Sequence, residues 1–286
     1  MILIIESGST KTAWRFISHL HEAYESFSSR GINPYYQTAE EIRKDQADIL
    51  QKIELLSIQF VYYFGTGITD DSKKEIIKSV LSPVIGHAEI AIQSDLMAAG
   101  LALCGEDAGI ACILGTGANS GYFEKGVLQS QVPPLGFWLG DEGSGGHLGK
   151  SLLLAYLHQQ LPSDLRVLFE KRFGALDRLE ILQKAYREEF PNRWFASFSK
   201  FLFDHRKHPF CYQLIENSFQ SFCDLYLLRY ENAKQHRIHF TGSVAFYYAD
   251  ILRRVLKANH LQAGIISEGP MAGLTLYYKA LHRSIF

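Results

Sequence analysis

Two turns rich in glycine and hydroxyl groups contain the residues best suited to bind a phosphate. Residues 110–121 read I-A-C-I-L-G-T-G-A-N-S-G: an apolar run, a turn with Thr116 between two glycines, and then small and polar residues. Glycine lets a backbone bend sharply and approach a ligand closely. The N–H groups of such a turn, together with a hydroxyl, can bind phosphate oxygens. For this copy alone, an ordinary hairpin turn is the alternative.

A second copy of the pattern stands at the start of the sequence. Residues 2–12 read I-L-I-I-E-S-G-S-T-K-T, and Trp14, Phe16 and Ile17 follow. In both segments a short β-rich apolar run ends at glycine, which predicts strand, turn and strand. The pair therefore predicts a duplicated α/β domain in which each half supplies one phosphate-binding loop.

Composition and charge set the class of protein. With 286 residues, 47% of them hydrophobic and 21% charged, the chain can form one large or two medium globular domains. A formal net charge of −1 gives no general attraction for nucleic acid or for an acidic membrane surface. There is no signal-peptide pattern, no membrane-spanning apolar stretch and no C-x-x-C spacing among the four cysteines. We therefore expect a cytoplasmic protein without a zinc site.

Two polar residues stand at predicted turns or strand ends. Asn33 lies in the turn R-G-I-N-P, where it either stabilises the turn or binds a polar substrate, and composition favours the turn. Asp95 follows a predicted strand over 88–93 and precedes a predicted helix over 96–103. It can cap that helix, or it can present a carboxylate at the edge of the sheet where open α/β folds bind ligands. The two roles are compatible.

Two further segments place small residues next to charged or hydroxyl groups. Residues 133–150 contain six glycines around Asp141 and Glu142, which fits a loop that closes over a ligand and enters a helix near His147. A flexible linker is the alternative, but the interleaved apolar residues argue against it. Residues 241–245, T-G-S-V-A, open a predicted helix and allow a ring or a phosphate to come near the backbone, or simply allow close packing.

Apolar spacing predicts the remaining elements. Helices are expected over residues 38–58, 72–81, 212–230, 241–256 and 270–278, and the segment 151–222 should be mostly helical with breaks at Pro162, Gly174, Pro191 and Pro209. Further strands are expected over 59–64 and 238–240. A third G-T-G at 65–67 is predicted to be a structural turn, because helix signals follow it.

Six short strings, taken in order, carry a family resemblance: E-S-G-S-T-K-T, G-I-N-P, S-D at 94–95, G-T-G-A-N-S, L-G-D-E-G-S-G and T-G-S-V-A. Over nearly its whole length the chain resembles the sugar-kinase branch of the actin, Hsp70 and hexokinase superfamily, and within it the BadF/BadG/BcrA/BcrD ATPase and N-acetylglucosamine kinase-like family. The resemblance implies two ribonuclease-H-like (actin-like ATPase) α/β domains with a nucleotide cleft between them. Their expected limits are 1–107, completed by a C-terminal helix at about 274–286, and 108–273, with a helical insertion.

The resemblance also implies roles for individual residues. Those expected to hold ATP are Ser9, Thr10, Lys11, Thr12, Gly115, Thr116, Gly117 and Asn119 at the phosphates and Gly242 and Ser243 at the adenosine. Asp95 is expected to be the general base that accepts a proton from the sugar hydroxyl. The expected sugar contacts are Asn33, Thr116, Gly136 and Asp141.

The first loop departs from the family pattern. That loop usually opens with aspartate, which holds Mg²⁺ through water, whereas this chain has Glu6. Because Mg²⁺ demands tight octahedral geometry, the longer arm must shift the ion or reach it differently. The implied activity is phosphorylation of an amino sugar, N-acetylglucosamine at its 6-hydroxyl, with ATP and Mg²⁺, and homodimers are common in the family.

Two other functions stay open. One is the ATPase that activates 2-hydroxyacyl-CoA dehydratases, which needs an iron–sulfur cluster held by cysteines. The other is a sugar sensor that has kept the fold and lost turnover, a reading that Glu6 keeps open. A nucleic-acid or membrane partner is expected for none of the three.

Overall fold

The computed structural model describes residues 1–18, 24–54, 56–231 and 233–282. The chain divides into two compact units, one formed by Met1–Asp107, Glu124–Leu128 and Gly269–Phe286, and the other by Ala108–Phe123 and Gln129–Glu268. In the described part of the chain, no helix combines the length and apolar character needed to cross a lipid bilayer.

The first unit is built on a five-stranded sheet. Its strands are β1 (Ile2–Ser7), β2 (Lys11–Ile17), β3 (Tyr24–Arg30), β4 (Phe60–Gly65) and β5 (Glu89–Ser94), in the order β3-β2-β1-β4-β5. The hairpin strands β1, β2 and β3 pair antiparallel, whereas β4 pairs parallel to β1 and to β5. The carboxyl ends of β1, β4 and β5 therefore meet at one edge.

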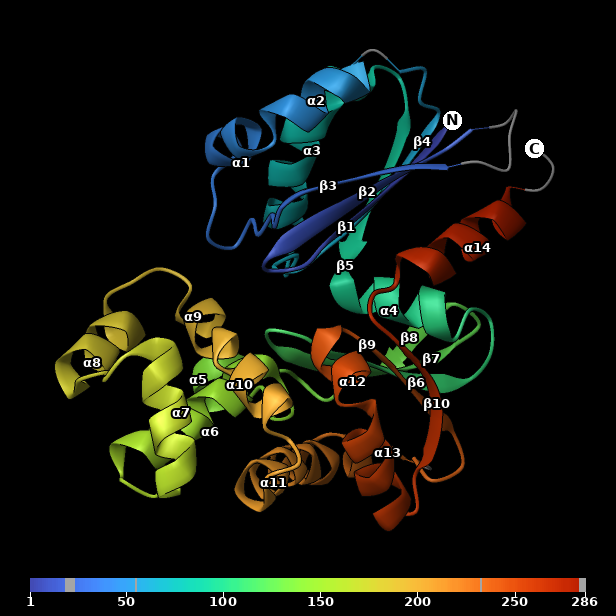
Figure 1. Ribbon diagram of the computed structural model, residues 1–286. Coiled ribbons are helices and arrows are strands. Elements are labelled where there is room, and N and C mark those ends of the chain that lie inside the picture. Colours follow the sequence, from blue (N-terminus) through green and yellow to red (C-terminus); the bar gives the residue numbers. More distant parts are fainter. Residues whose placement is uncertain (19–23, 55, 232, 283–286) are drawn as a thin grey trace. The chain divides into compact units, whose positions relative to one another are not determined.

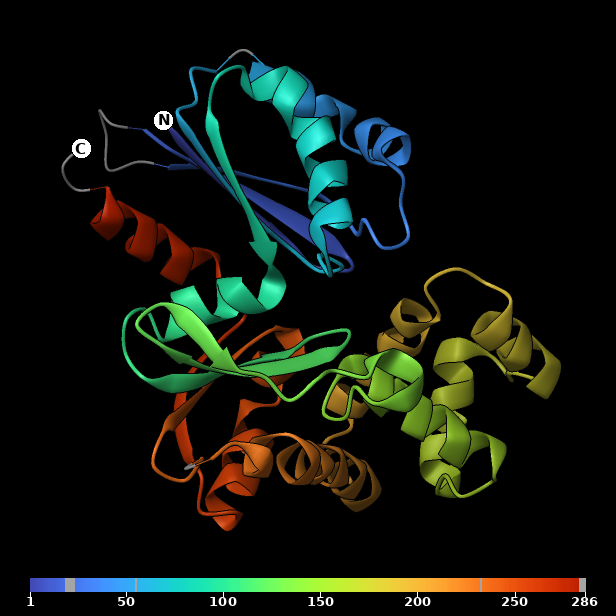
Figure 2. The same ribbon diagram turned by 180° about the vertical axis from the view of Figure 1, so that it is seen from behind.

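Alternate residues of β1 point to opposite faces of this sheet, and each face has its own core. Leu3 and Ile5 pack with α1 (Ala39–Asp45), α2 (Ala47–Glu54) and α3 (Asp71–Ile85). Ile2 and Ile4 pack with α4 (Asp95–Leu103) and α14 (Met271–Leu281). Figures 1 and 2 show the two sets of helices on opposite sides of the sheet.

The last helix, α14, completes the first unit from the far end of the chain. It packs on α4 so closely that a methyl group added to Gly273 would overlap the carbonyl oxygen of Ala102. Leu274 and Tyr278 enter the same core as Ala98 and Leu101 of α4. The position of α4 therefore depends on a segment more than a hundred residues away.

The second unit repeats the same strand succession. Its strands are β6 (Gly109–Leu114), β7 (Ala118–Glu124), β8 (Val127–Ser130), β9 (Arg237–Thr241) and β10 (Gln262–Ser267), in the order β8-β7-β6-β9-β10. An antiparallel hairpin, β6–β7, again leads the sheet, and β9 pairs parallel to the leading strand β6 and to β10. This repeated topology is the duplication that the two loop patterns predicted.

Helices supply most of the second unit's residues. They are α5 (Gly136–Leu139), α6 (Gly145–Leu157), α7 (Ser163–Phe173), α8 (Arg178–Tyr186), α9 (Pro191–Ser197), α10 (Ser199–Asp204), α11 (Pro209–Leu225), the 3₁₀ turn Leu227–Arg229, α12 (Ser243–Tyr247) and α13 (Ala249–Ala258). One continuous core joins the sheet to these helices. In both ribbon views α7 and α8 lie beside the sheet rather than over it (Figure 1, Figure 2).

Most predicted elements are present, with differences that have local causes. The helix expected over 38–58 is two helices, α1 and α2, separated at Gln46. Strands β3, β8 and β10 were not predicted, and β10 is irregular, with a register shift between Ala263 and Ile266. The breaks predicted at Pro191 and Pro209 are correct, because each proline occupies the first turn of a helix.

Gly149 in α6 provides a test of the packing in the second unit. A methyl group at this position would overlap the carbonyl oxygen of Phe195 in α9. We expect Gly149→Ala to lower the free energy of unfolding by about 2 kcal/mol, because overpacking outweighs the gain of about 1 kcal/mol from better helix propensity. Chemical denaturation measures the change.

Gly269→Ala, between β10 and α14, is a control for the added methyl group alone, because no atom lies within 4 Å of that group and no left-handed backbone is required there. We expect it to leave stability unchanged or to raise it by less than about 1 kcal/mol. A stabilised Gly149→Ala variant would show that α6 and α9 are not packed as described.

Candidate active site

In the first unit, strand register brings the predicted residues to one edge. Ser7 at the end of β1 pairs with Gly65 of β4, and Gly65 pairs with Ser94 of β5. The loop after β1, the G-T-G turn after β4 and the start of α4 therefore lie at the same carboxyl edge. Open α/β sheets bind their ligands at this edge.

The first loop is a tight hairpin closed by a hydrogen bond from Gly8 N to Lys11 O of 3.0 Å. Thr10 and Lys11 are exposed and Ser9 is partly exposed, so their side chains can meet a ligand. Thr12 is fully buried, and its hydroxyl bonds to Ser7 Oγ (2.7 Å) and donates to Arg30 O (2.9 Å). Thr12 therefore fixes the shape of the loop.

Asp95 is the first residue of α4. Sequence allowed Asp95 itself to cap this helix, but the N-cap is Ser94, whose hydroxyl accepts from Met97 N at 3.3 Å. The Asp95 carboxylate accepts hydrogen bonds from the Thr66 hydroxyl and from the Leu96 amide, while burial raises its pKa. The prediction that Asp95 caps α4 was wrong, because Ser94, one position earlier, is the N-cap. The Asp95 carboxylate is therefore available for chemistry.

Glu6 faces the same space as Asp95. Burial is the main cause that raises the pKa of Glu6 to about 7, the negative charge of Asp95 adds to it, and Lys11 opposes it. Two carboxylates close together in a poorly solvated place favour a proton or a cation between them. The site therefore has a negative centre that Lys11 offsets only in part.

Asn33 connects two of the loops at this edge. Its side-chain Oδ1 accepts from Tyr35 N at 3.0 Å, and its backbone N–H donates to Gln37 Oε1 at 2.8 Å, so Asn33 has the turn role that composition favoured. A methyl group on Gly67, which has a φ of 76°, would overlap Asn33 Oδ1. The turn after β4 thus packs directly on the side chain predicted to contact sugar.

The second loop, in the second unit, is fixed by backbone hydrogen bonds from the start of α6. Gly115 N donates to Gly117 O at 3.0 Å and closes the turn. Gly145 N and Gly146 N, at the start of α6, donate to the carbonyl oxygens of Gly115 and Thr116 at 2.8 and 3.0 Å. Because these carbonyls are satisfied, the loop has a defined shape before any ligand arrives.

Asp141 lies against this loop. Its Oδ1 accepts from Ala118 N at 3.2 Å, and a methyl group on Gly117 would stand 2.9 Å from its Oδ2. Burial raises the pKa of Asp141 to about 6, so the side chain is mostly ionised at pH 7. Its φ of 63° is left-handed, a conformation that costs a residue with a Cβ free energy. Gly136, at the start of α5, also has a positive φ, 73°.

The other predicted nucleotide contacts lie at the same edge of the second sheet. Asn119 Oδ1 accepts from Ser120 N and from Gln131 Nε2, both at 2.9 Å. Gly242 has a φ of 114°, and a methyl group there would overlap Leu114 O, so close packing is one reason for this glycine. Ser243 follows it as the exposed first residue of α12.

One contact in the first unit was missed by the sequence. The G-T-G turn at 65–67 was predicted to be purely structural, yet Thr66 hydrogen-bonds to the carboxylate of Asp95. Its likeness to the other two turns was the available signal.

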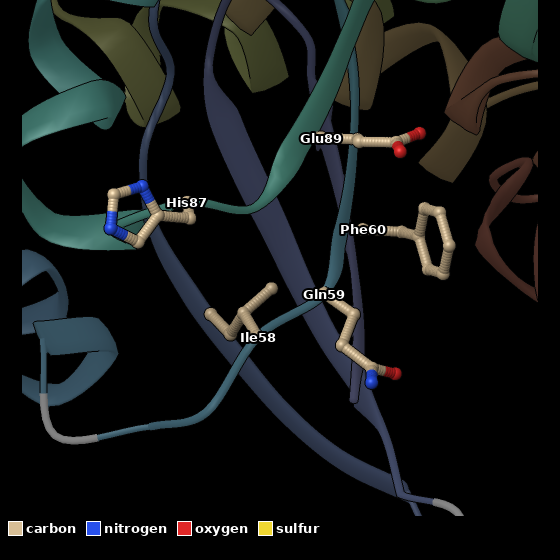
Figure 3. Close-up of a pocket in the computed structure, with 5 residues that line it drawn as sticks. All are labelled: Ile58, Gln59, Phe60, His87 and Glu89. Atoms are coloured by element: carbon tan, nitrogen blue, oxygen red, sulfur yellow. The ribbon is translucent and has the colours of Figure 1, made fainter.

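A pocket at the opposite edge of the first sheet is lined by Ile58, Gln59, Phe60, His87 and Glu89 (Figure 3). Phe60 pairs with Glu89 at the amino ends of β4 and β5, away from the loops. Figure 3 shows the His87 ring and the Glu89 carboxylate pointing away from each other. They form no common ligand set, so the carboxyl edges remain the candidate sites.

No protein-family model matches the chain, and no curated protein matches it. A solved structure provisionally named N-acetylglucosamine kinase, from Porphyromonas gingivalis, is 39% identical with a TM-score of 0.90, covering 99% of this chain and 100% of that one.

Two more distant structures share the fold. A protein provisionally named N-acetylglucosamine kinase from Chromobacterium violaceum is 16% identical with a TM-score of 0.72, covering 96% of this chain and 98% of that one. MreB5 of Spiroplasma citri, bound to ADP, is 10% identical with a TM-score of 0.58, covering 99% and 98%. The duplicated ribonuclease-H-like fold of the actin-like ATPases is therefore confirmed. By its 39% identity over nearly the whole of both chains, the chain belongs to the N-acetylglucosamine kinase-like family of the actin, Hsp70 and hexokinase superfamily.

Proposed function

We propose that this chain is an ATP-dependent sugar kinase that phosphorylates N-acetylglucosamine at its 6-hydroxyl. The observation that carries the proposal is the Asp95 carboxylate, held by Thr66 and Leu96 at the carboxyl edge of the first sheet. The names of the relatives support the sugar, and the ADP of MreB5 supports a nucleotide for this fold.

In the proposed reaction Asp95 accepts the proton of the attacking sugar hydroxyl. Its raised pKa makes it a stronger base than an ordinary carboxylate, and its two hydrogen bonds fix its direction. Asp141, mostly ionised at pH 7, accepts a hydrogen bond from another sugar hydroxyl. Because Oδ1 of Asn33 already accepts from Tyr35, Asn33 would contact the sugar through its side-chain nitrogen.

The two glycine-rich loops would bind the nucleotide. The exposed Ser9, Thr10 and Lys11 of the first unit, and the Gly115–Thr116–Gly117 turn of the second, would bind phosphate oxygens. Phosphoryl transfer depends mainly on alignment and on neutralising charge, which amides and a lysine can supply. Gly242 and Ser243 would lie against the adenosine.

Mg²⁺ fits the negative centre around Glu6. The negative charges of Glu6 and Asp95 attract a cation, and oxygen donors are the ligands that Mg²⁺ prefers. Glu6 would hold the ion through water, and the ion would offset charge on the transferring phosphate. The cytoplasmic location and the homodimer stay predictions.

An assay of sugar-dependent ADP release tests the proposal. The panel is N-acetylglucosamine, glucosamine, glucose and N-acetylmuramic acid, and NMR of the product identifies the phosphorylated hydroxyl. We expect N-acetylglucosamine to give the highest kcat/KM. Binding of sugar in calorimetry without ADP release would instead establish a sensor, and iron in anaerobically purified protein would point to a dehydratase activator. The four cysteines are buried and favour neither the sugar sensor nor the dehydratase activator.

Replacing Asp95 tests the base. We expect Asp95→Ala to lower kcat at least about a hundredfold, because proton acceptance contributes typically 10²–10⁴-fold. ATP affinity, measured by calorimetry, should stay close to that of the wild type. Asp95→Asn is the matched variant, because it keeps the size and a hydrogen-bond acceptor but cannot take the proton. Near-normal turnover in either variant would remove Asp95 from this role.

Replacing Glu6 tests the negative centre through stability. Since the pKa of Glu6 is raised from 4.5 to about 7, its contribution to stability is present below pH 4.5 and is lost as pH rises through 7. Glu6→Gln lacks this loss. We therefore compare the free energy of unfolding of Glu6→Gln with that of the wild type at each pH. The difference should favour the variant by about 2 kcal/mol more at pH 8 than at pH 5.

Denaturation in the presence of a chelator measures the difference at the two pH values. Glu25→Gln, at an exposed position of strand β3, is the control that removes a carboxylate from the same sheet but outside the candidate site. An equal effect of Glu6→Gln at pH 5 and pH 8 would show that Glu6 has an ordinary pKa.

A further inference from the structure

Helix α11 carries three residues on one face that support the loop containing Asp141. Ser218, Phe222 and Tyr226 follow each other at intervals of four residues, which places them along one side of the helix and its C-cap. The sequence predicts only a helix over residues 212–230. Two of the three residues instead hydrogen-bond to the loop through a hydroxyl.

Tyr226 makes the most direct contacts. Its hydroxyl donates to Glu142 Oε2 at 2.9 Å, and the Tyr226 hydroxyl oxygen accepts a hydrogen bond from the backbone amide of Asp141. A methyl group on Gly140 would stand only 2.8 Å from this hydroxyl. The turn 140–142 is therefore packed directly onto the tyrosine oxygen.

The other two residues fix the next part of the loop. Ser218 Oγ accepts from Gly143 N at 3.1 Å and shares a hydrogen bond with His147 Nδ1 at 2.8 Å. The Phe222 ring packs against Gly143 and stacks on the Tyr226 ring, with centroids 5.2 Å apart. Tyr226 is thus itself locked in place, with 4% of its surface exposed.

Asp141 needs such support, because its φ of 63° is unfavourable for a residue with a Cβ. A strained conformation persists only where the surroundings determine it. The hydrogen bond from Ala118 N holds the carboxylate end of Asp141, and the Tyr226 hydroxyl holds the turn at the backbone end.

We propose that Tyr226 is a positioning residue for Asp141: its hydroxyl holds the turn 140–142 so that Asp141 keeps the left-handed conformation that aims its carboxylate at the sugar. This inference rests on the proposed function in taking Asp141 as a sugar contact. Tyr226 acts through Glu142 and the turn, and does not itself touch the substrate.

The test is Tyr226→Phe, which removes one oxygen and keeps the ring that stacks on Phe222. We expect KM for the sugar to rise about tenfold, since a hydrogen bond to a charged group is lost and the turn can relax. KM for ATP and kcat at saturating sugar should change by less than about twofold, because the lost contact orients the sugar and not the phosphates. A loss of folding would instead lower the apparent kcat and leave both KM values unchanged, because fewer molecules would be active.

Tyr156→Phe is the matched control. Tyr156 is also a buried tyrosine of the second unit whose hydroxyl donates to a glutamate, Glu170, at 3.0 Å, but it stands at the far end of α6 from the loop. We expect this variant to leave KM for the sugar unchanged. An equal rise in the two variants, or none in Tyr226→Phe, would overturn the proposal.

A crystal structure of Tyr226→Phe gives a readout independent of activity. We expect Asp141 to leave the left-handed region or its carboxylate to part from Ala118 N, and an unchanged turn would overturn the proposal. If the wild-type protein releases no ADP with any sugar, the proposed function is wrong, and this crystal structure alone decides whether Tyr226 holds Asp141.

Discussion

The parallel pairing of β1, β4 and β5 is the constraint on which the candidate site of the first unit depends. Because Ser7, Gly65 and Ser94 share one register, three chain segments leave the sheet at the same level. Glu6, Thr66 and Asp95 can then act on one another, although none of them is near another in sequence. The second unit applies the same rule, with Thr116 and Gly242 each just beyond a strand end at one sheet edge.

Burial raises the pKa of two carboxylates at this edge, those of Asp95 and Glu6. A general base, the role proposed for Asp95, benefits from a raised pKa, and burial raises the pKa of this carboxylate. The same burial, together with the charge of Asp95, moves Glu6 to the point where it is half protonated near neutral pH. The pKa of Glu6 therefore responds both to burial and to the charge of Asp95.

Local patterns predicted the hairpins, the duplication and the strand-to-helix junction at Asp95, because each is written in a short run of residues. Contacts set by register could not be found this way. Thr66 reaches Asp95 only because β4 lies beside β5, and Tyr226 meets a glutamate 84 positions away. Strand β3 was missed because Y-E-S-F-S-S-R alternates weakly and occupies a sheet edge. The N-cap of α4 was misassigned by one residue because serine and aspartate are both good caps.

The packing of α14 on α4 has a consequence for how the chain is made. The first unit opens the sequence, but its second face is completely covered only when the last helix has been synthesised, whereas the second unit lies almost wholly within the chain before that point. Folding on the ribosome usually follows synthesis order from the N-terminus. Until α14 is made, only α4 covers this face of the first sheet, and the core formed by Ile2, Ile4 and Ala98 lacks Leu274 and Tyr278. We therefore expect the second unit to complete its core before the first.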